Sequence, residues 1–338
     1  MLAVLQHPPP ELQHDALNHL PPEIVSEIFI QFLPLYPEAP PLSGSLSPLL
    51  LGQICRRWRE IALSTPKLWR AIQFELEYGD FEKQDMHAEL LDAWLSRSGH
   101  CPLALSLTGF VGSNFFRSAL LYCRRWEHVE ICIPFENLHL IQHLEMPLLQ
   151  ELRIGPRDYP SQTFDNGFVA LELFDRAPQL KGLSLTRYFL EAAMHFPWAQ
   201  LTHLDGECIY VAECMAILSE APQLVECAFA ICSSDDPQTS IPPLPVHHQL
   251  QFFTLHIDGS FDPDVRLSII LDSVTMPALR TLQIHGPNIT LESLVAFISR
   301  SQCTLDELRI AKGEIEHSVY RDALPSVRTI TVEKSEDD

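Results

Sequence analysis

The segment MPLLQELRIGP, residues 146–156, contains the pattern that decides the fold. An apolar residue and a proline precede Leu149, Leu152 and Ile154, which are spaced as Leu–x–x–Leu–x–Ile. In an extended chain, Leu152 and Ile154 point to one side and the residues between them point to the other. The spacing therefore predicts a short strand with one buried face.

The same template recurs along the chain. Four further segments keep its proline: residues 177–187, 221–231, 276–286 and 324–334. Five more follow it without the proline or in a weaker form: residues 101–109, 124–134, 198–208, 247–257 and 303–313. Successive units begin roughly 21 to 31 residues apart, which overlaps the period of leucine-rich repeats. Helical patterns lie between them at residues 169–178, 211–222 and 291–302.

Such strand–helix units must stack, because one unit cannot bury its own apolar face. The pattern predicts an α/β fold, a solenoid of about ten repeats with a curved parallel sheet. The irregular period and the missing asparagine of the repeat motif indicate divergent leucine-rich repeats.

A different pattern precedes the repeats, in HLPPEIVSEIFIQFL, residues 19–33. Pro21 and Pro22 suit the first turn of a helix, where the missing N–H costs nothing. Beyond them, two apolar stripes run side by side: Ile24, Ile28 and Phe32; Val25, Phe29 and Leu33. An arc this wide exceeds what one neighbouring helix can cover.

A second helical pattern, LGQICRRWREIA, spans residues 51–62. We predict one helix here, with an apolar face and with Arg56, Arg59 and Glu60 leaning away from it. The Pro/Ser-rich stretch 34–48 before it predicts an irregular loop. The pattern of residues 85–97 predicts an amphipathic helix, and Gly99 predicts its C-terminal end.

These features resemble the F-box, the module by which substrate receptors join Skp–cullin–F-box ubiquitin ligases. The matching residues are Leu20-Pro21 with Glu23, Ile28-Phe29, Cys55-Arg56-Arg57-Trp58, and Leu68-Trp69. The stretch that follows, LLDAWLSRSGHCPLALSL, resembles the continuation found in fungal, particularly basidiomycete, receptors. The 35–48 insert departs from compact F-boxes.

The resemblance implies that a Skp-type adaptor contacts the N-terminal module, residues 19–74. The implied contacts are Leu20, Pro21, Ile24, Ile28, Phe29, Ile54, Cys55, Trp58, Ile61, Leu68 and Trp69. Independently, a module of about 55 residues is too small to bury two such wide arcs by itself. In the alternative interpretation, Trp58 is core between the module and the repeats.

Target-facing candidates are the residues that flank the strand leucines. They are Arg153, Arg187, His203, Asp205, Phe252, Thr254, His256 and His285, with Glu151, Ser184, Thr186, Gln283 and Arg309 at equivalent positions. Phe252 is the most suggestive, since it is aromatic and lies beside Phe253. If the register is shifted by one residue, every assignment moves to the other face.

Composition narrows the possible partners and compartments. A formal net charge of −21 argues against nucleic acid, because phosphate backbones are repelled. Nine irregularly spaced cysteines predict reduced thiols in a cytoplasmic or nuclear protein. The first residues do not resemble a signal peptide, and no apolar run is long enough to span a membrane.

No motif for catalysis, a metal or a cofactor stands out. His139 and His143 are four residues apart, but no third ligand accompanies them, so we expect ordinary histidines and no metal. Nucleophile elbows, phosphate loops and paired carboxylates are absent from the sequence, which argues against an enzyme.

The expected organisation is a disordered leader (1–18), an F-box (19–74), a connecting helix (75–100), a repeat domain (101–334) and an acidic tail (335–338). The expected function is a non-catalytic substrate receptor of a ubiquitin ligase, which joins a cullin through its adaptor and holds an unknown target protein. The alternative is a leucine-rich-repeat scaffold without a ligase role, whose F-box-like helices only cap the solenoid.

Overall fold

The computed structural model describes residues 20–77, 83–156, 171–186, 194–233, 246–257, 267–286, 289–311 and 315–333. The predicted leader and acidic tail lie outside these ranges. Within them, eleven strands form one parallel sheet in the order β1-β2-β3-β4-β6-β8-β9-β10-β11-β12-β13. Each strand therefore pairs with the next one along the chain, apart from β5 (Leu171–Glu172) and β7 (Met194–His195), which pair separately.

The eleven strands of the sheet are β1 (Ala71–Leu76), β2 (Leu103–Gly109), β3 (Trp126–Ile133), β4 (Glu151–Pro156), β6 (Gly182–Leu185), β8 (His203–Tyr210), β9 (Glu226–Ser233), β10 (Phe252–Ile257), β11 (Thr281–His285), β12 (Glu307–Ala311) and β13 (Thr329–Glu333). All of them except β1 overlap the ten template segments. The parallel sheet is confirmed. The additional strand, β1, directly follows the N-terminal helices and has no template of its own.

Alternation along the strands places the template leucines in the core. In β4, Leu152 and Ile154 are each 2% exposed, whereas the side chain of Glu151, directly before Leu152, is exposed. In β10, Phe253 is fully buried and Phe252 is 42% exposed, so the predicted register is correct there and is not shifted by one residue.

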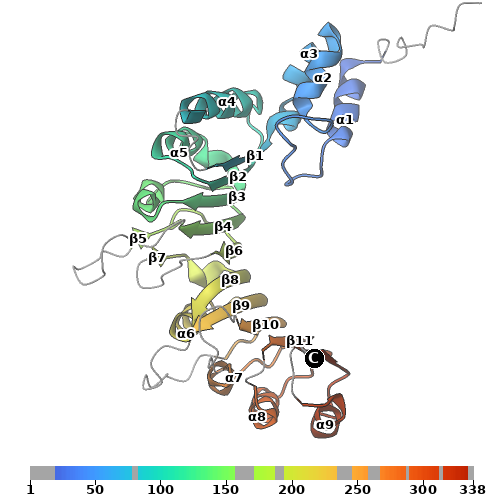
Figure 1. The fold of residues 1–338 in the computed structure, drawn as a ribbon, viewed down its shortest axis with the longest axis vertical. Coiled ribbons are helices and arrows are strands. Elements are labelled where there is room, and N and C mark those ends of the chain that lie inside the picture. Colours follow the sequence, from blue (N-terminus) through green and yellow to red (C-terminus); the bar gives the residue numbers. More distant parts are fainter. Residues whose placement is uncertain are drawn as a thin grey trace, which may run out of the picture.

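The strands are stacked along an arc, and the longer helices lie on its outer side (Figure 1). These helices are α4 (Gln84–Arg97), α5 (Ser113–Leu120), α6 (Val211–Glu220), α7 (Ser268–Ser273), α8 (Leu291–Ser301) and α9 (His317–Ala323). Short 3₁₀ turns add η4 (Cys123–Arg125), η5 (Phe135–Ile141) and η8 (Trp198–Gln200). The inner face of the sheet carries no helix within the described ranges.

The helix predictions have mixed outcomes. Those for residues 85–97, 211–222 and 291–302 are confirmed by α4, α6 and α8, and Gly99 follows α4 with a φ of 58°. The prediction of a helix at residues 169–178 is wrong for residues 171–178, the part that the structure describes. There the Leu173 N–H donates to the His195 carbonyl at 2.8 Å, so the chain pairs with β7 instead of coiling.

The N-terminal module contains α1 (Pro22–Phe32), α2 (Pro48–Ile54), α3 (Arg56–Leu63) and η2 (Pro66–Trp69). The prediction of a single helix over residues 51–62 is wrong, because the backbone of Cys55 is extended (φ −155°, ψ 169°) and separates α2 from α3. Cys55 Sγ accepts a hydrogen bond from the Trp58 N–H at 3.4 Å and so caps α3. As predicted, residues 34–47 contain no helix or strand.

Two tryptophans join the module to the sheet. Trp69 of η2 and Trp94 of α4 meet edge to face, with ring centroids 4.9 Å apart. Trp69 Nε1 donates to the Ala62 carbonyl at 2.8 Å, and Trp94 Nε1 donates to the Ala71 carbonyl of β1 at 3.1 Å. Both rings are at most 1% exposed, so the cores of the module and the sheet are continuous.

Candidate functional site

Helix α1 buries one of its two apolar stripes and exposes the other. Val25 and Phe29 are 1% and 2% exposed, whereas Ile24 and Ile28 are 49% and 44% exposed. At the end of α2, Ile54 is 54% exposed. Large aliphatic side chains on neighbouring turns of one helix, left open to solvent, are typical of a surface that binds another protein. We call Ile24 and Ile28 the apolar stripe of α1.

The predicted adaptor contacts fall into two groups. Pro21, Ile24, Ile28, Ile54 and Cys55 are exposed, and Leu20 and Trp58 are partly exposed. The other four, Phe29, Ile61, Leu68 and Trp69, are at most 7% exposed. These four residues were predicted to contact the adaptor directly, and their burial corrects that prediction. They are core residues beneath the exposed surface.

Trp58 lies within the module and not between the module and the sheet. Its ring packs against that of Phe29 with centroids 4.9 Å apart, and part of it stays open to solvent. The alternative in which Trp58 fills the space between the module and the repeats is therefore wrong.

The three arginines around Trp58 have structural partners. Arg57 donates to the Leu20 carbonyl at the start of α1, and Arg59 Nε donates to the Gly52 carbonyl of α2 at 2.7 Å. Arg56 pairs with Glu60 at 2.9 Å on the surface. Arg57 and Arg59 thus tie the three helices together by satisfying backbone carbonyls.

The 35–48 insert reaches back to the inner face of the sheet. Tyr36 Oη donates to Glu127 Oε2 of β3 at 2.6 Å, and the Arg70 guanidinium lies 3.8 Å above the tyrosine ring. The ring also meets His128 edge to face at 5.5 Å. Burial and the neighbouring Glu127 carboxylate raise the pKa of Tyr36, so the phenol stays protonated and remains a donor.

Replacing Tyr36 with phenylalanine should loosen the insert without unfolding the protein. The ring would keep its contact with Arg70 but lose the hydrogen bond to a carboxylate, which contributes about 1.5–3 kcal/mol. We expect faster cleavage of residues 34–47 by a protease under native conditions and little change in the unfolding midpoint. Unchanged cleavage would show that the hydroxyl does not hold the insert.

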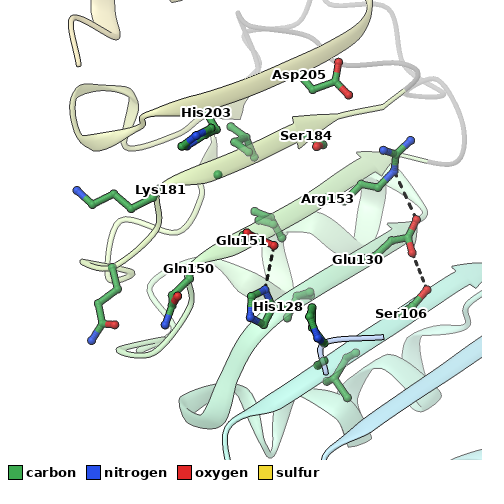
Figure 2. Close-up of a pocket in the computed structure, with 18 of the residues that line it drawn as sticks. Ser106, His128, Glu130, Gln150, Glu151, Arg153, Lys181, Ser184, His203 and Asp205 are labelled. Carbon is green, nitrogen blue, oxygen red and sulfur yellow. Dashed lines mark hydrogen bonds and ion pairs between the residues drawn. The ribbon is translucent and has the colours of Figure 1, made fainter. Parts of the chain in front are cut away.

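A groove of about 1580 Å³ lies between the insert and the inner face of the sheet. Residues 35–39 form one wall, and side chains from β1 to β9 form the floor. Two rows of side chains cross the strands in register. The first row is Ser106, Glu130, Arg153, Ser184 and Asp205; the second is Ala104, His128, Glu151, Gly182, His203 and Glu226. Figure 2 shows the first row, together with His128, Glu151 and His203 of the second, on the same face of the sheet.

Hydrogen bonds and ion pairs link neighbours along these rows. Glu130 accepts from the Ser106 hydroxyl at 2.7 Å and lies 3.4 Å from Arg153 Nε. Arg153 also pairs with Glu207 at 2.7 Å, and His128 contacts Glu151 at 2.9 Å. Burial and the nearby Glu207 raise the pKa of Asp205, and Arg153 opposes this shift.

The groove contains only some of the predicted target-facing residues. Arg153, His203 and Asp205 line it, as do the predicted residues Glu151 and Ser184. Phe252, Thr254, His256 and His285 lie on the same face but farther along, on β10 and β11, and Arg187 lies outside the described residues. Sequence reasoning missed the insert wall and four side chains of the floor: Ser106, His128, Glu130 and Glu226. The acidic residue at the outward position of segment 221–231 could have indicated Glu226.

The remaining candidates give no second site. His143 follows η5 with a φ of 60° and contacts Asp175 at 3.3 Å, whereas His139 contacts the Glu136 carbonyl, so the two rings have separate partners. All nine cysteines are free thiols. None of the helices within the described ranges has the length and apolar character needed to cross a membrane.

Comparison with known protein families identifies the N-terminal module. Residues 17–75 match the F-box-like domain, which covers all of α1, α2, α3 and η2. The N-terminal part of the chain is therefore an F-box-like domain, and such domains generally bind Skp-type adaptors. No curated protein matches the chain.

Proposed function

We propose that this protein is a non-catalytic substrate-recognition subunit of a Skp–cullin–F-box ubiquitin ligase. The F-box-like domain would bind the Skp-type adaptor, and the adaptor would connect the chain to a cullin. The inner face of the parallel sheet would hold the target protein.

The observation that carries this proposal is the apolar stripe of α1 within the matched domain. Ile24 and Ile28 are close to half exposed, although Val25 and Phe29 on the same helix are buried. Isoleucines left open on a folded domain gain free energy when a partner covers them, about 25 cal/mol per Å² of apolar surface. An adaptor that covers α1 would supply that gain.

The mechanism requires no catalytic residue or cofactor in this chain. A rigid receptor raises the effective concentration of a target lysine beside a charged ubiquitin-conjugating enzyme. The continuous core across Trp69 and Trp94 supports this role, since it would transmit a fixed orientation from the adaptor to the target.

We further propose that the sheet is built from divergent leucine-rich repeats of a fungal type. The recurrence of the template in ten strands supports this interpretation. The domain boundaries proposed are 19–74 for the F-box, 75–100 for the connecting helix and 101–334 for the repeats. The proposed location, cytoplasm or nucleus, agrees with nine free thiols.

A scaffold without a ligase role is the second candidate. It is favoured by the position of the module at the edge strand β1, where Trp69 and Trp94 cover the end of the stacked core. Arrays of repeats need such caps to shield their terminal apolar faces. In this case the apolar stripe of α1 would have no adaptor to bind.

The test is co-purification of the full chain with a Skp-type adaptor, both at micromolar concentration. We expect a stoichiometric complex that persists through size-exclusion chromatography. A chain that is folded, as judged by circular dichroism, but elutes separately from the adaptor would reject the receptor and favour the scaffold.

A further inference from the structure

The groove between the insert and the sheet is elongated across the strands. Its floor draws on seven consecutive strands, from Gln73 of β1 to Ala228 of β9, but on few positions along each strand. With neighbouring strands about 4.8 Å apart, six intervals span roughly 29 Å, the length of about nine extended residues. Small side chains at Ala104, Gly182 and Ala228 leave room above the floor. The shape therefore suits an extended segment that crosses the strands.

The charges that line the groove are mostly negative. Its acidic side chains are Glu38, Glu130, Glu151, Asp205 and Glu226, and its only lysine or arginine side chains are Arg153 and Lys181. Arg153 pairs with Glu130 and Glu207, whereas Lys181 donates to the neutral Gln200 carbonyl at 3.2 Å. Among the residues that line the groove, Lys181 is thus the one lysine or arginine without a carboxylate partner, and five carboxylates would oppose an anionic ligand.

Among the described residues, three of the five carboxylates form no side-chain hydrogen bond or ion pair: Glu38 of the insert, and Asp205 and Glu226 of the sheet. Asp205 and Glu226 lie on adjacent strands, since His203 beside Asp205 pairs with Glu226 across β8 and β9. Burial chiefly raises the pKa of Asp205, and the nearby Glu207 carboxylate adds to this shift. These carboxylates would gain from a cation brought by a ligand.

The insert gives the groove its second wall and a fixed position. Tyr36 is held by Glu127 and Arg70, so residues 35–39 stand over the end of the groove formed by β2 to β4. In Figure 2, Asp205 lies on a strand beyond Arg153, and His128 lies toward the other end of the row of strands. The site is therefore walled at one end, and acidic side chains line it from Glu38 in that wall to Glu226 on β9.

We propose that this groove binds an extended, lysine- or arginine-rich segment of a protein target. The inference deepens the proposed function by giving the chemical class of the target, and it rests on that function only in calling the ligand a target. The segment would run across the strands, with cationic side chains at Asp205 and Glu226 and its other end against the insert.

The test uses the purified full chain without an adaptor. The probe is a fluorescein-labelled peptide of about nine residues in which lysine alternates with alanine, because alternate residues of an extended peptide face the same side. A peptide with glutamate in place of lysine is the reference. We expect the lysine peptide to bind, as measured by fluorescence anisotropy, and the glutamate peptide not to bind. Absence of lysine-peptide binding would overturn the proposal.

Matched variants separate a built site from general attraction to an acidic chain. Asp205→Asn combined with Glu226→Gln removes two groove charges, and we expect affinity to fall about tenfold. The control, Glu220→Gln with Asp272→Asn, removes two charges from exposed positions on α6 and α7 and should change affinity less than about twofold. Equal losses in both variants would mean that only the net charge attracts the peptide, and would reject the groove.

A third variant tests the wall. Tyr36→Ala leaves the charge unchanged but removes the anchor of the insert, so we expect weaker peptide binding with normal adaptor binding. Unchanged peptide affinity would remove the insert from the site. Because the peptide assay contains no adaptor and the adaptor assay contains no peptide, either the groove or the receptor role can fail without the other.

Discussion

Replacing Ile28 with aspartate should abolish adaptor binding and leave the fold intact. Ile28 is 44% exposed in the middle of α1, one position before the buried Phe29. At an exposed helical position, aspartate costs about 0.5 kcal/mol of helix propensity. At an apolar interface it would bury an unpaired charge, which costs at least about 3 kcal/mol and corresponds to a loss of affinity of more than about 100-fold.

The matched control is Leu121→Asp. Leu121 is 79% exposed at the end of α5, on the outer side of the sheet and away from the module. The same exchange of an exposed aliphatic residue for aspartate there should leave the complex unchanged. Both variants should keep the circular dichroism and the unfolding midpoint of the natural chain. A complex that survives Ile28→Asp would show that the apolar stripe of α1 is not the adaptor surface.

The sheet could be predicted because strand period and burial are local properties of the sequence. Each template places two apolar residues two positions apart, and a strand with one buried face requires that spacing. The two apolar stripes of α1 could also be predicted from the sequence, but the helical pattern does not indicate which of the two is buried. That choice depends on α3, whose Trp58 packs on Phe29 and leaves Ile24 and Ile28 outside.

The rest of the site depends on contacts between residues far apart in the chain. Tyr36 and Glu127 are 91 residues apart, so nothing near either residue indicates that the insert would contact the sheet. The break at Cys55 was also hidden, because LGQICRRWREIA keeps a helical period on both sides of it. Only the extended backbone of Cys55 and the bond from Arg59 to Gly52 reveal two helices.

Strand β1 was missed for a similar reason. From Ile72 onward, its sequence AIQFEL alternates buried and exposed residues. However, Pro66 and Leu68 before it belong to η2 of the helical module, and the spacing from Leu68 to Ile72 is one residue longer than in the template. Its place in the sheet is set by pairing with β2, from Ala71 opposite Ala104 to Leu76 opposite Gly109. The junction between module and sheet is thus a product of tertiary pairing, and it could not be derived from a repeat period.

The neighbouring phenylalanines of β10 give a direct test of which residues of this strand face the inner side of the sheet. Phe253 is fully buried, so Phe253→Ala should lower the free energy of unfolding by about 3–5 kcal/mol through lost burial and the cavity left behind. Phe252 is 42% exposed on the inner face, so Phe252→Ala should lower it by less than about 1 kcal/mol. Chemical denaturation of both variants measures the difference in the free energy of unfolding for the same substitution at two adjacent residues. If the two losses were equal or reversed, β10 would present its other face, and the side chains assigned to the inner face of this strand would belong to the core.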